Sequence, residues 1–537
     1  MNQLFYGDNL EVLDQHFQNE TVDLIYLDPP FNSDRQYNLL FRESSGAASE
    51  AQIEAFEDSW HWGPKAAEAY HRVMTGRNQP VAKSLGAMVD GLGHCDMTAY
   101  LAMMAARLIE LHRILKPTGS LFLHCDPTAG PYLRVILDAV FGPTCFTNEI
   151  VWKRTSTHNS AKRFAPIHDT IQYYRKGNEY TWNGLFTDLN EGYVEKFYRF
   201  VDSEGRRYRL SDLTAAGIRK GESGQVWRGI DPGKKGRHWV AIHSTLERWD
   251  ASGRLQWPLH GQMPQFKRYL DEMRGQPGST VWTDIPVIGA HSKERLHYQT
   301  QKPLGLLERI IASASNPGDL VLDPFCGCGT AIHAANKLER KWAGIDITYL
   351  AINLIERRMR DAFPGLDMKI VGEPVDYASA RNLALRDKYQ FQWWALSKVD
   401  GQPVSGKKTK GADKGKDGVI PMYLGAAKGY KNAIVSVKGG ENVDVVSIRD
   451  LRGVIERENS PLGVLITLNP PTKPMITEAA TAGRFESEEF GRSYPRIQIL
   501  TIEEYFAGKR LDLPGKVNPY AKSSVEKIHS GKLSLNI

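Results

Sequence analysis

Short apolar runs alternate with one-sided helical patterns in the first third of the chain. Residues 22–27 are apolar and rich in β-formers, and residues 120–124 and 149–152 form similar runs. Between these runs, the apolar positions of residues 97–115 and 132–141 keep one helical face. This alternation predicts an α/β fold built on a doubly wound parallel sheet.

The run at residues 22–27 ends in Asp28-Pro29-Pro30-Phe31. Proline lacks the amide N–H that a sheet ladder needs, so the strand stops here and Asp28 stands at its carboxyl end. In open α/β sheets, ligands bind at that edge. On these residues alone, a plain strand-to-loop turn is the alternative to a functional site.

A second pattern of strand, glycine turn and helix start covers residues 316–330. Gly327 and Gly329 let the backbone turn sharply and approach a ligand, and Thr330 begins the helix. A further strand ends in Asp346, where an acid is placed to accept hydrogen bonds from ribose hydroxyls. The loop has neither the glycine spacing of a dinucleotide fingerprint nor the lysine of a P-loop.

Together these motifs resemble those of the amino-methyltransferases that act on DNA, the adenine-N6 and cytosine-N4 enzymes. Residues 299–304 are similar to the segment that closes over the cofactor in that family, although Cys328 stands where its glycine loop usually has serine. The catalytic motif comes first, a recognition region follows and the cofactor motif is last, an order that resembles the beta group. Aspartate before Pro-Pro favours adenine, and cytosine N4 is the alternative.

The resemblance implies a Rossmann-like, S-adenosyl-L-methionine-dependent methyltransferase that modifies double-stranded DNA at specific sites, in a restriction-modification system or a related one. The catalytic residues implied are Asp28, Pro29, Pro30 and Phe31. The cofactor-binding residues implied are Asp323, Pro324, Phe325, Gly327, Gly329, Thr330, Asp346, Thr300, Lys302 and Pro303.

The residue types of the catalytic motif suit this chemistry. An exocyclic amino group is a poor nucleophile because its lone pair is delocalised into the ring. A carboxylate at Asp28 and a fixed carbonyl at Pro29 would accept its two hydrogens and localise the lone pair on nitrogen. Phe31 offers a face on which an extruded base can stack.

Between residues 176 and 290 the α/β periodicity disappears, and aromatic residues alternate with Lys and Arg. We interpret this segment as the target-recognition region, in which cations neutralise phosphates and a few side chains read base edges. A solvated β-rich insertion is the alternative. The predicted DNA-binding residues are Lys153 and Arg154 before the segment, and Arg206, Arg207, Arg209, Lys234, Lys235 and Arg237 within it.

A Gly- and Lys-rich stretch at residues 407–418 leads into patterns that predict a C-terminal α/β module. Asp417, followed by a strand ending Ser436-Val437-Lys438, is similar to the restriction-endonuclease-like superfamily, whose acids and lysine bind magnesium and the scissile phosphate. Ser436 stands where an acid or glutamine belongs, and a hydroxyl is a poor magnesium ligand. A nuclease using Asp417, Lys438 and Mg2+, fused to the methyltransferase, is one hypothesis; a DNA-binding or structural relic is the other.

The composition permits a DNA partner, because the 537 residues carry a formal net charge of +6. The five cysteines lack metal-ligand spacing and no apolar run is long enough for export or a membrane span, so we expect reduced thiols, no structural metal and a cytoplasmic protein acting on the bacterial nucleoid. A homodimer, a separate restriction subunit and a DNA-binding regulator with an inactive catalytic half stay open. The predicted domains are a catalytic half at 1–175, the recognition region at 176–290, a cofactor half at 291–375, the endonuclease-like module at 376–515 and a tail at 516–537.

Overall fold

The computed structural model divides the chain into two units. One comprises residues 1–183 and 279–532, and the described part of the other is residues 184–278. No helix in the part of the chain that the structure describes has the length and apolar character of a membrane span. The described residues are 2–30, 61–156, 164–187, 189, 191–260, 263–289, 292, 294–296, 301–403, 416–425, 429–441, 443–515 and 526.

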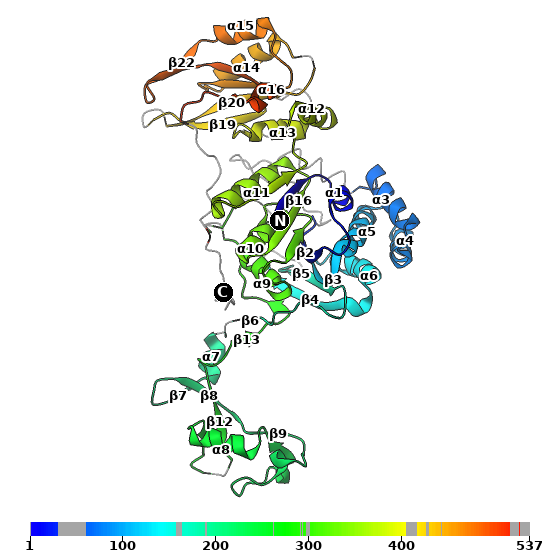
Figure 1. Ribbon diagram of the computed structural model, residues 1–537, viewed down its shortest axis with the longest axis vertical. Helices are drawn as coiled ribbons and strands as arrows, with labels where there is room; N and C mark the ends of the chain where they lie inside the picture. The colour runs from blue at the N-terminus through cyan, green and yellow to red at the C-terminus, as the bar shows by residue number, and fades with distance from the viewer. Residues whose placement is uncertain are drawn as a thin grey trace. The chain divides into compact units, whose positions relative to one another are not determined.

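A nine-stranded mixed sheet forms the centre of the first unit, in the order β14-β4-β5-β3-β2-β15-β16-β1-β17 (Figure 1). Neighbours from β3 to β17 are parallel, whereas β5 runs antiparallel to β3 and β4. Helices cover both faces, which confirms the predicted doubly wound, Rossmann-like α/β fold. The strands are β1 (Gln3–Tyr6), β2 (Val22–Leu27), β3 (Leu115–Cys125), β4 (Phe146–Lys153), β5 (His168–Arg175), β14 (Val281–Trp282), β15 (Leu320–Asp323), β16 (Lys341–Asp346) and β17 (Lys369–Val371).

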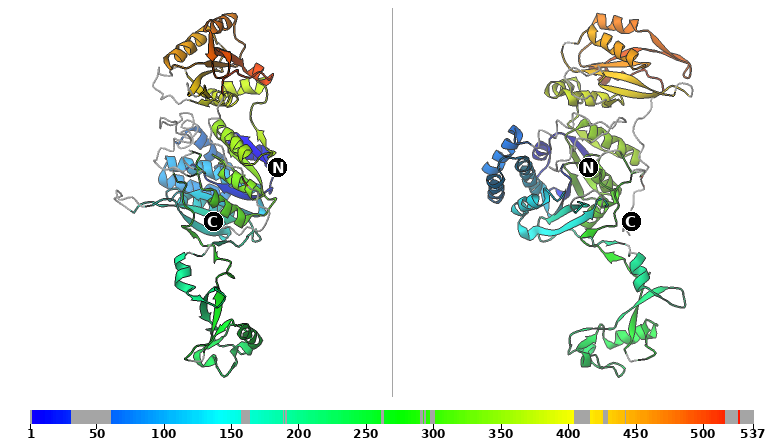
Figure 2. Two further views of the ribbon diagram at one scale, coloured as in Figure 1. Left: turned by 90° about the vertical axis from the view of Figure 1, so that its left-hand side faces the viewer. Right: turned by 180° about the vertical axis from the view of Figure 1, so that it is seen from behind.

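The helices of this sheet form two layers (Figures 1 and 2). Helices α1, α5 and α6 lie on one face, with α3 and α4 packed outside them, and α9, α10 and α11 lie on the other. The helices are α1 (Asn9–His16), α3 (Pro64–Thr75), α4 (Gln79–Leu92), α5 (Asp96–Ile114), α6 (Gly130–Phe141), the 3-10 turn η1 (Pro143–Cys145), α9 (Leu304–Ala314), α10 (Thr330–Lys337) and α11 (Tyr349–Ala362).

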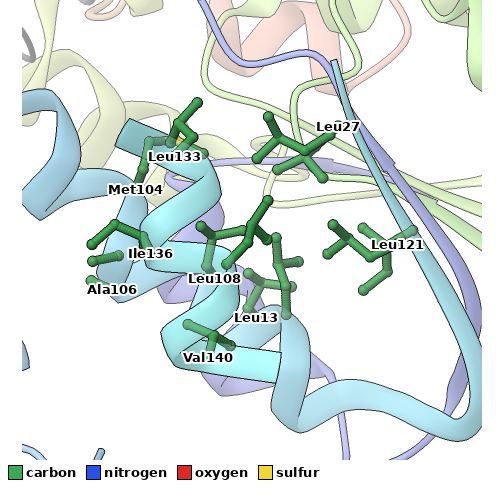
Figure 3. Packing of buried hydrophobic residues seen from close by; sticks show 14 of the residues in the cluster. Leu13, Leu27, Met104, Ala106, Leu108, Leu121, Leu133, Ile136 and Val140 are labelled. Atoms are coloured by element: carbon green, nitrogen blue, oxygen red, sulfur yellow. The ribbon is translucent and has the colours of Figure 1, made fainter. Parts of the chain in front are cut away.

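Aliphatic side chains from α1, α5, α6, β2 and β3 form the core beneath the first layer (Figure 3). The helical face predicted for residues 97–115 is the buried face of α5, on which Leu101, Leu108 and Leu111 are fully buried. Leu27, at the end of β2, and Leu121, on β3, pack into the same cluster. Burial of one such leucine stabilises the fold by roughly 1.5–3 kcal/mol. The core therefore fixes the end of β2 at the point where Asp28 follows.

The second unit is built mainly from antiparallel strands around a small core of its own. A four-stranded sheet has the order β11-β12-β8-β7, and β9 and β10 form a separate ribbon. Trp227, Trp239 and Leu246 are buried in its core. The elements are β6 (Phe186–Thr187), α7 (Glu191–Phe197), β7 (Phe200–Val201), β8 (Arg207–Asp212), β9 (Thr214–Ala216), the 3-10 turns η2 (Glu222–Gly224) and η3 (Gly233–Lys235), β10 (Arg237–Trp239), α8 (His243–Ala251), β11 (Leu255–Gln256), β12 (Gln265–Tyr269) and β13 (Gln276–Pro277).

Residues beyond β17 fold around a second mixed sheet, in the order β18-β19-β20-β21-β24. Strands β19 and β20 form an antiparallel pair, and β20, β21 and β24 are parallel. Helices α14 and α15 bury Ile448, Leu451 and Met475 in a core with this sheet. The elements are α12 (Tyr377–Arg386), α13 (Lys388–Ser397), β18 (Gln402–Pro403), β19 (Gly418–Tyr423), β20 (Tyr430–Lys438), α14 (Val445–Arg457), β21 (Gly463–Thr467), α15 (Lys473–Thr481), β22 (Arg484–Ser487), β23 (Arg492–Pro495), β24 (Ile497–Thr501) and α16 (Ile502–Phe506).

Candidate active site

Three neighbouring parallel strands end in carboxylates at one edge of the large sheet. Asp28 directly follows β2, Asp323 closes β15 and Asp346 closes β16. Strand β15 lies between the other two, with Leu322 opposite Ile25. The carboxyl ends of parallel strands share one edge of a sheet, so the three acids lie at that edge together.

Lys302 enters this acidic edge from the segment before α9. The Lys302 Nζ donates to Asp28 Oδ2 and forms an ion pair with it, although Lys302 is 274 positions further along the chain. Both side chains are largely buried. The ammonium therefore offsets negative charge where the acids crowd together.

Burial shifts the other two acids toward their neutral forms. Asp323 is 4% exposed, and burial together with the nearby negative charges of Asp28 and Asp346 raises its pKa well above the ordinary value. Burial likewise raises the pKa of Asp346 to about 6, against the hydrogen bonds that it accepts. The edge therefore concentrates acceptor oxygens in an environment of low dielectric.

The glycine loop between β15 and α10 is tied to Asp346. Gly327 N donates to Asp346 Oδ2 over 3.0 Å, and the Thr348 amide and hydroxyl both donate to Oδ1 over 2.9 Å. Gly327 and Gly329 have φ of 50° and 75°, in the left-handed region that the sharp turn requires. Because a carboxylate has about four lone-pair sites, Asp346 keeps capacity for a further donor such as a ribose hydroxyl.

Helix α11 holds the same loop from behind, which the sequence did not indicate. Arg358 is 5% exposed, and its Nη1 donates to the Cys328 carbonyl over 2.8 Å and to the Thr330 hydroxyl over 3.3 Å. A Cβ on Gly329 would lie 2.9 Å from Ile355 Cγ1 on the same helix. The sequence gives no signal for this contact, because Arg358 lies in a run of charged residues on α11.

A second buried arginine supports the loop from the opposite layer. Asn9 Nδ2 donates to the Pro324 carbonyl over 2.9 Å, and Arg107 Nε donates to Asn9 Oδ1 over 2.5 Å. Arg107 Nη2 also binds Asp8 Oδ2 over 2.8 Å, while Asp8 Oδ1 caps α1 by accepting from the Leu10 amide. Asp8 and Asn9 therefore connect the start of the chain to the loop after β15.

A chain of buried hydrogen bonds runs beneath the turn that follows β2. Tyr26 Oη and His124 Nδ1 are 3.0 Å apart, and His124 Nε2 lies 3.2 Å from Asp169 Oδ2. The Asp169 carboxylate can only accept, so Nε2 carries the proton that bonds to Asp169. Arg154 pairs with the other oxygen of Asp169 over 3.4 Å. This network spans β2, β3 and β5 and fixes the strand that carries Asp28.

The remaining predicted residues of the two motifs that the structure describes lie around this edge. Pro29 is buried and Pro30 half-buried directly after Asp28, while Pro303 is buried at the start of α9. Phe31 and Thr300 lie outside the described residues. The other members of the cofactor set, Pro324, Phe325, Gly327, Gly329 and Thr330, form the turn from β15 into α10.

The predicted DNA-binding residues divide by whether they have partners inside the protein. Arg206 pairs with Asp271 and Glu272, and Arg237 pairs with Asp212. Arg207 donates to the Tyr198 carbonyl and Arg209 to the Tyr193 hydroxyl. Lys153 at the end of β4 is exposed, as are Lys234 and Lys235 in η3.

In the C-terminal sheet, Asp417 lies just before β19 and accepts hydrogen bonds from the neighbouring strand β20. Its Oδ2 accepts from the Val437 amide over 2.7 Å and from the Ser436 hydroxyl over 3.1 Å, and Lys438 closes β20. The described residues hold no group of three or more His, Cys, Asp or Glu side chains arranged to bind a metal ion. Within the described residues, the nuclease hypothesis therefore lacks a set of side chains that could bind magnesium.

These features define a member of the DNA methylases: the chain belongs to the N6_N4_Mtase family, whose pattern matches residues 22–357. It is 36% identical over 261 residues to the Type II methyltransferase M.EcaI of Enterobacter cloacae, covering 48% of this chain and 57% of the relative. It is 27% identical to the StyLTI Mod subunit of a Type III restriction-modification enzyme from Salmonella typhimurium, covering 64% of this chain and 51% of the relative. The match to these two relatives spans little more than half of their length.

One of the similar solved structures is a DNA methyltransferase. The PvuII DNA methyltransferase, described as cytosine-N4-specific, is 14% identical with a TM-score of 0.31, covering 68% of this chain and 89% of that one.

Proposed function

We propose that this chain transfers a methyl group from S-adenosyl-L-methionine to the N6 amino group of adenine in double-stranded DNA, as the modification enzyme of a restriction-modification system. The observation that carries the proposal is the placement of Asp28 and the glycine loop on adjacent strands, β2 and β15, at one sheet edge. Direct methyl transfer requires the cofactor and the target base to be bound side by side, so the residues that bind them must lie close together.

The loop and the acids fit the cofactor. Gly327, Gly329 and Thr330 let the backbone approach it, and Asp346 has acceptor capacity for ribose hydroxyls. Lys302 and Pro303 lie beside this set at the start of α9. S-adenosylmethionine supplies an activated methyl group, so the protein needs no covalent intermediate.

Asp28 would act on the base. Its carboxylate and the Pro29 carbonyl accept the hydrogens of the extruded amino group, which directs the nitrogen lone pair toward the methyl donor. Proline rings at positions 29 and 30 restrict the backbone that presents these acceptors. Phe31 would supply a stacking face for the base. Lys302 forms an ion pair with the Asp28 carboxylate and holds it in place beside the base.

The methylated base is inferred from the Asp before Pro-Pro, which favours adenine; cytosine N4 is the second candidate, because the family covers both amino groups. The Mod relative is named as a subunit of a restriction-modification enzyme, which supports a separate restriction subunit as a partner. A fused nuclease at Asp417 and Lys438 would require Mg2+-dependent cleavage of unmethylated DNA that disappears in Lys438→Ala.

The catalytic assignment is tested with Asp28→Ala in the full chain. We expect methyl transfer to DNA to fall below detection while S-adenosylmethionine still binds in calorimetry, because Asp28 acts on the base. Asp90→Ala, at an exposed position of α4, is the control and should retain full activity. Near wild-type transfer by Asp28→Ala would overturn the assignment.

A further inference from the structure

Helix α13 lies beyond residue 357, where the family pattern ends, yet it packs against a helix of the large sheet. It contacts both α11 and the strands β18 and β20 of the C-terminal sheet. Phe391 and Trp394 on this helix are buried. A Cβ on Gly439, directly after β20, would lie 2.8 Å from Phe391 Cδ1. Helix α13 therefore joins the C-terminal sheet to α11.

The first turns of α11 and α13 meet in a buried hydrogen bond. The Tyr349 amide, at the first position of α11, donates to Gln390 Oε1 over 3.2 Å. Tyr349 is 2% exposed and Gln390 is 5% exposed. The first amides of a helix have no acceptor within the helix, and this one is shielded from water. Gln390 therefore supplies the acceptor that this amide requires.

The turn that carries Gln390 is itself fixed. Asp387 caps α13, and its Oδ1 accepts from the amides of Tyr389 and Gln390, each over 3.0 Å. Beyond the other end of α13, Asp400 pairs with Arg357 on α11. The two helices are therefore connected at both ends of their contact, and the Gln390 side chain projects from a rigid turn.

The amide that Gln390 holds is next to the carboxylate proposed to bind ribose hydroxyls. Thr348 directly precedes Tyr349, and its amide and hydroxyl both donate to Asp346 Oδ1 over 2.9 Å. The Tyr349 ring stacks on Tyr6 with the ring centroids 3.8 Å apart, and Tyr6 lies opposite Asp346 in the pairing of β1 with β16. A shift of Tyr349 would therefore move Thr348 and redirect the Asp346 carboxylate.

We infer that Gln390 is a positioning residue of the S-adenosylmethionine site: it holds the first turn of α11, and through Thr348 the Asp346 carboxylate, where the ribose binds. The inference rests on the proposed function for the identity of the cofactor. Without Gln390 Oε1, the Tyr349 amide gains a partner only if the turn opens to water, and cofactor binding must then close the turn again. A residue outside the family segment thereby contributes to cofactor affinity.

The test is calorimetric titration of the full chain with S-adenosylmethionine and with S-adenosylhomocysteine, which has the same adenosine group. Gln390→Met keeps the side-chain length and removes the acceptor, so the Kd for both compounds should rise roughly tenfold. KM for the cofactor should rise with its Kd, while kcat at saturating cofactor stays within about twofold. Gln390→Glu retains an acceptor oxygen at the same reach and should keep the Kd within about threefold of wild type.

The matched control is Gln392→Met on the same helix. Gln392 Nε2 donates to the Asp417 carbonyl over 3.3 Å, so this variant also removes one hydrogen bond from α13, but toward the C-terminal sheet. It should lower the urea midpoint about as much as Gln390→Met and leave the cofactor Kd unchanged. An unchanged Kd in Gln390→Met, an equal rise in Gln392→Met or a failure of Gln390→Glu to restore binding would overturn the inference.

Hydrogen exchange in the wild-type chain gives a second test that does not depend on a variant. S-adenosylmethionine should slow amide exchange in the first turn of α13 as well as in the first turn of α11, and protection confined to α11 would overturn the inference. Cofactor binding without methyl transfer would refute the proposed function alone and leave these comparisons decisive. A wild-type chain that binds no S-adenosylmethionine would overturn both.

Discussion

Arg358 offers the sharpest test of how the cofactor loop is held. It lies on α11, is 5% exposed and donates from Nη1 to the Cys328 carbonyl and the Thr330 hydroxyl. Arg358→Met keeps a flexible side chain of similar length in the helix but removes both donors. The substitution therefore acts on the loop and leaves Asp28 unchanged.

The size of the effect follows from the hydrogen bonds. Leaving the buried Cys328 carbonyl without its hydrogen-bond donor should destabilise the loop by about 1–3 kcal/mol. Replacing the guanidinium also removes the cost of burying its charge. We therefore expect the free energy of unfolding to change less than the free energy of cofactor binding. Since 1.4 kcal/mol is a factor of ten, we expect the Kd for S-adenosylmethionine to rise by roughly 5- to 150-fold.

The assay is calorimetric titration of the full chain with S-adenosylmethionine, combined with steady-state methyl transfer. KM for the cofactor should rise with its Kd, while kcat at saturating cofactor stays within about threefold. Arg360→Met is the matched control, because Arg360 is 58% exposed on the same helix and pairs with Glu356 alone among the described residues. Wild-type cofactor affinity in Arg358→Met would refute the support that we assign to α11.

Three further predictions concern the sheet edge. Lys302→Met should lower kcat by roughly 10- to 100-fold with little change in DNA affinity, because it removes the cation paired with Asp28; unchanged kcat in a single-turnover assay would contradict this role. Gly344→Ala should cost roughly 1–3 kcal/mol in urea unfolding, since its Cβ would lie 2.2 Å from Ile332 Cδ1, and an unchanged midpoint would count against that packing. The pKa of Asp346 is raised to about 6, so its charged acceptor form is lost as pH falls below that value. The Kd for the cofactor should then rise about tenfold per pH unit below pH 6. Asp346→Asn should flatten this pH profile, and a pH dependence that persists in the variant would mean that another group titrates.

The sequence predicted the sheet and its active edge because both depend on local patterns. Apolar runs that end in Asp28, Asp323 and Asp346 are visible along the chain, and the rule for parallel strands brings their ends together. The one-sided face of residues 97–115 likewise corresponds to α5. These features require no knowledge of distant contacts.

The contacts that complete the site join residues far apart in the sequence. Lys302 was expected beside the cofactor, and it forms an ion pair with Asp28. Arg358 and Arg107 are arginines within helices, a position usually read as solvent-facing, and only the tertiary fold shows that both are buried beneath the loop. Pattern reasoning places side chains on faces, but it does not specify which distant carbonyl a buried arginine meets.

The partners of the second unit illustrate the same limit. Alternating aromatic and basic residues predicted DNA contacts for Arg206 and Arg237, and the structure gives both of them carboxylate partners within the unit. Lys234 and Lys235 are exposed as expected of phosphate-binding residues. Charge composition alone does not separate cations that hold a fold from cations that face an external partner.

The most direct measurement is transfer of labelled methyl from S-adenosylmethionine to unmethylated genomic DNA, followed by mass spectrometry of the nucleosides. The account predicts N6-methyladenine with the wild-type chain and none with Asp28→Ala. If the product is N4-methylcytosine, the proposed mechanism stands and the target base is cytosine. Cofactor binding without transfer to any base would contradict the central claim.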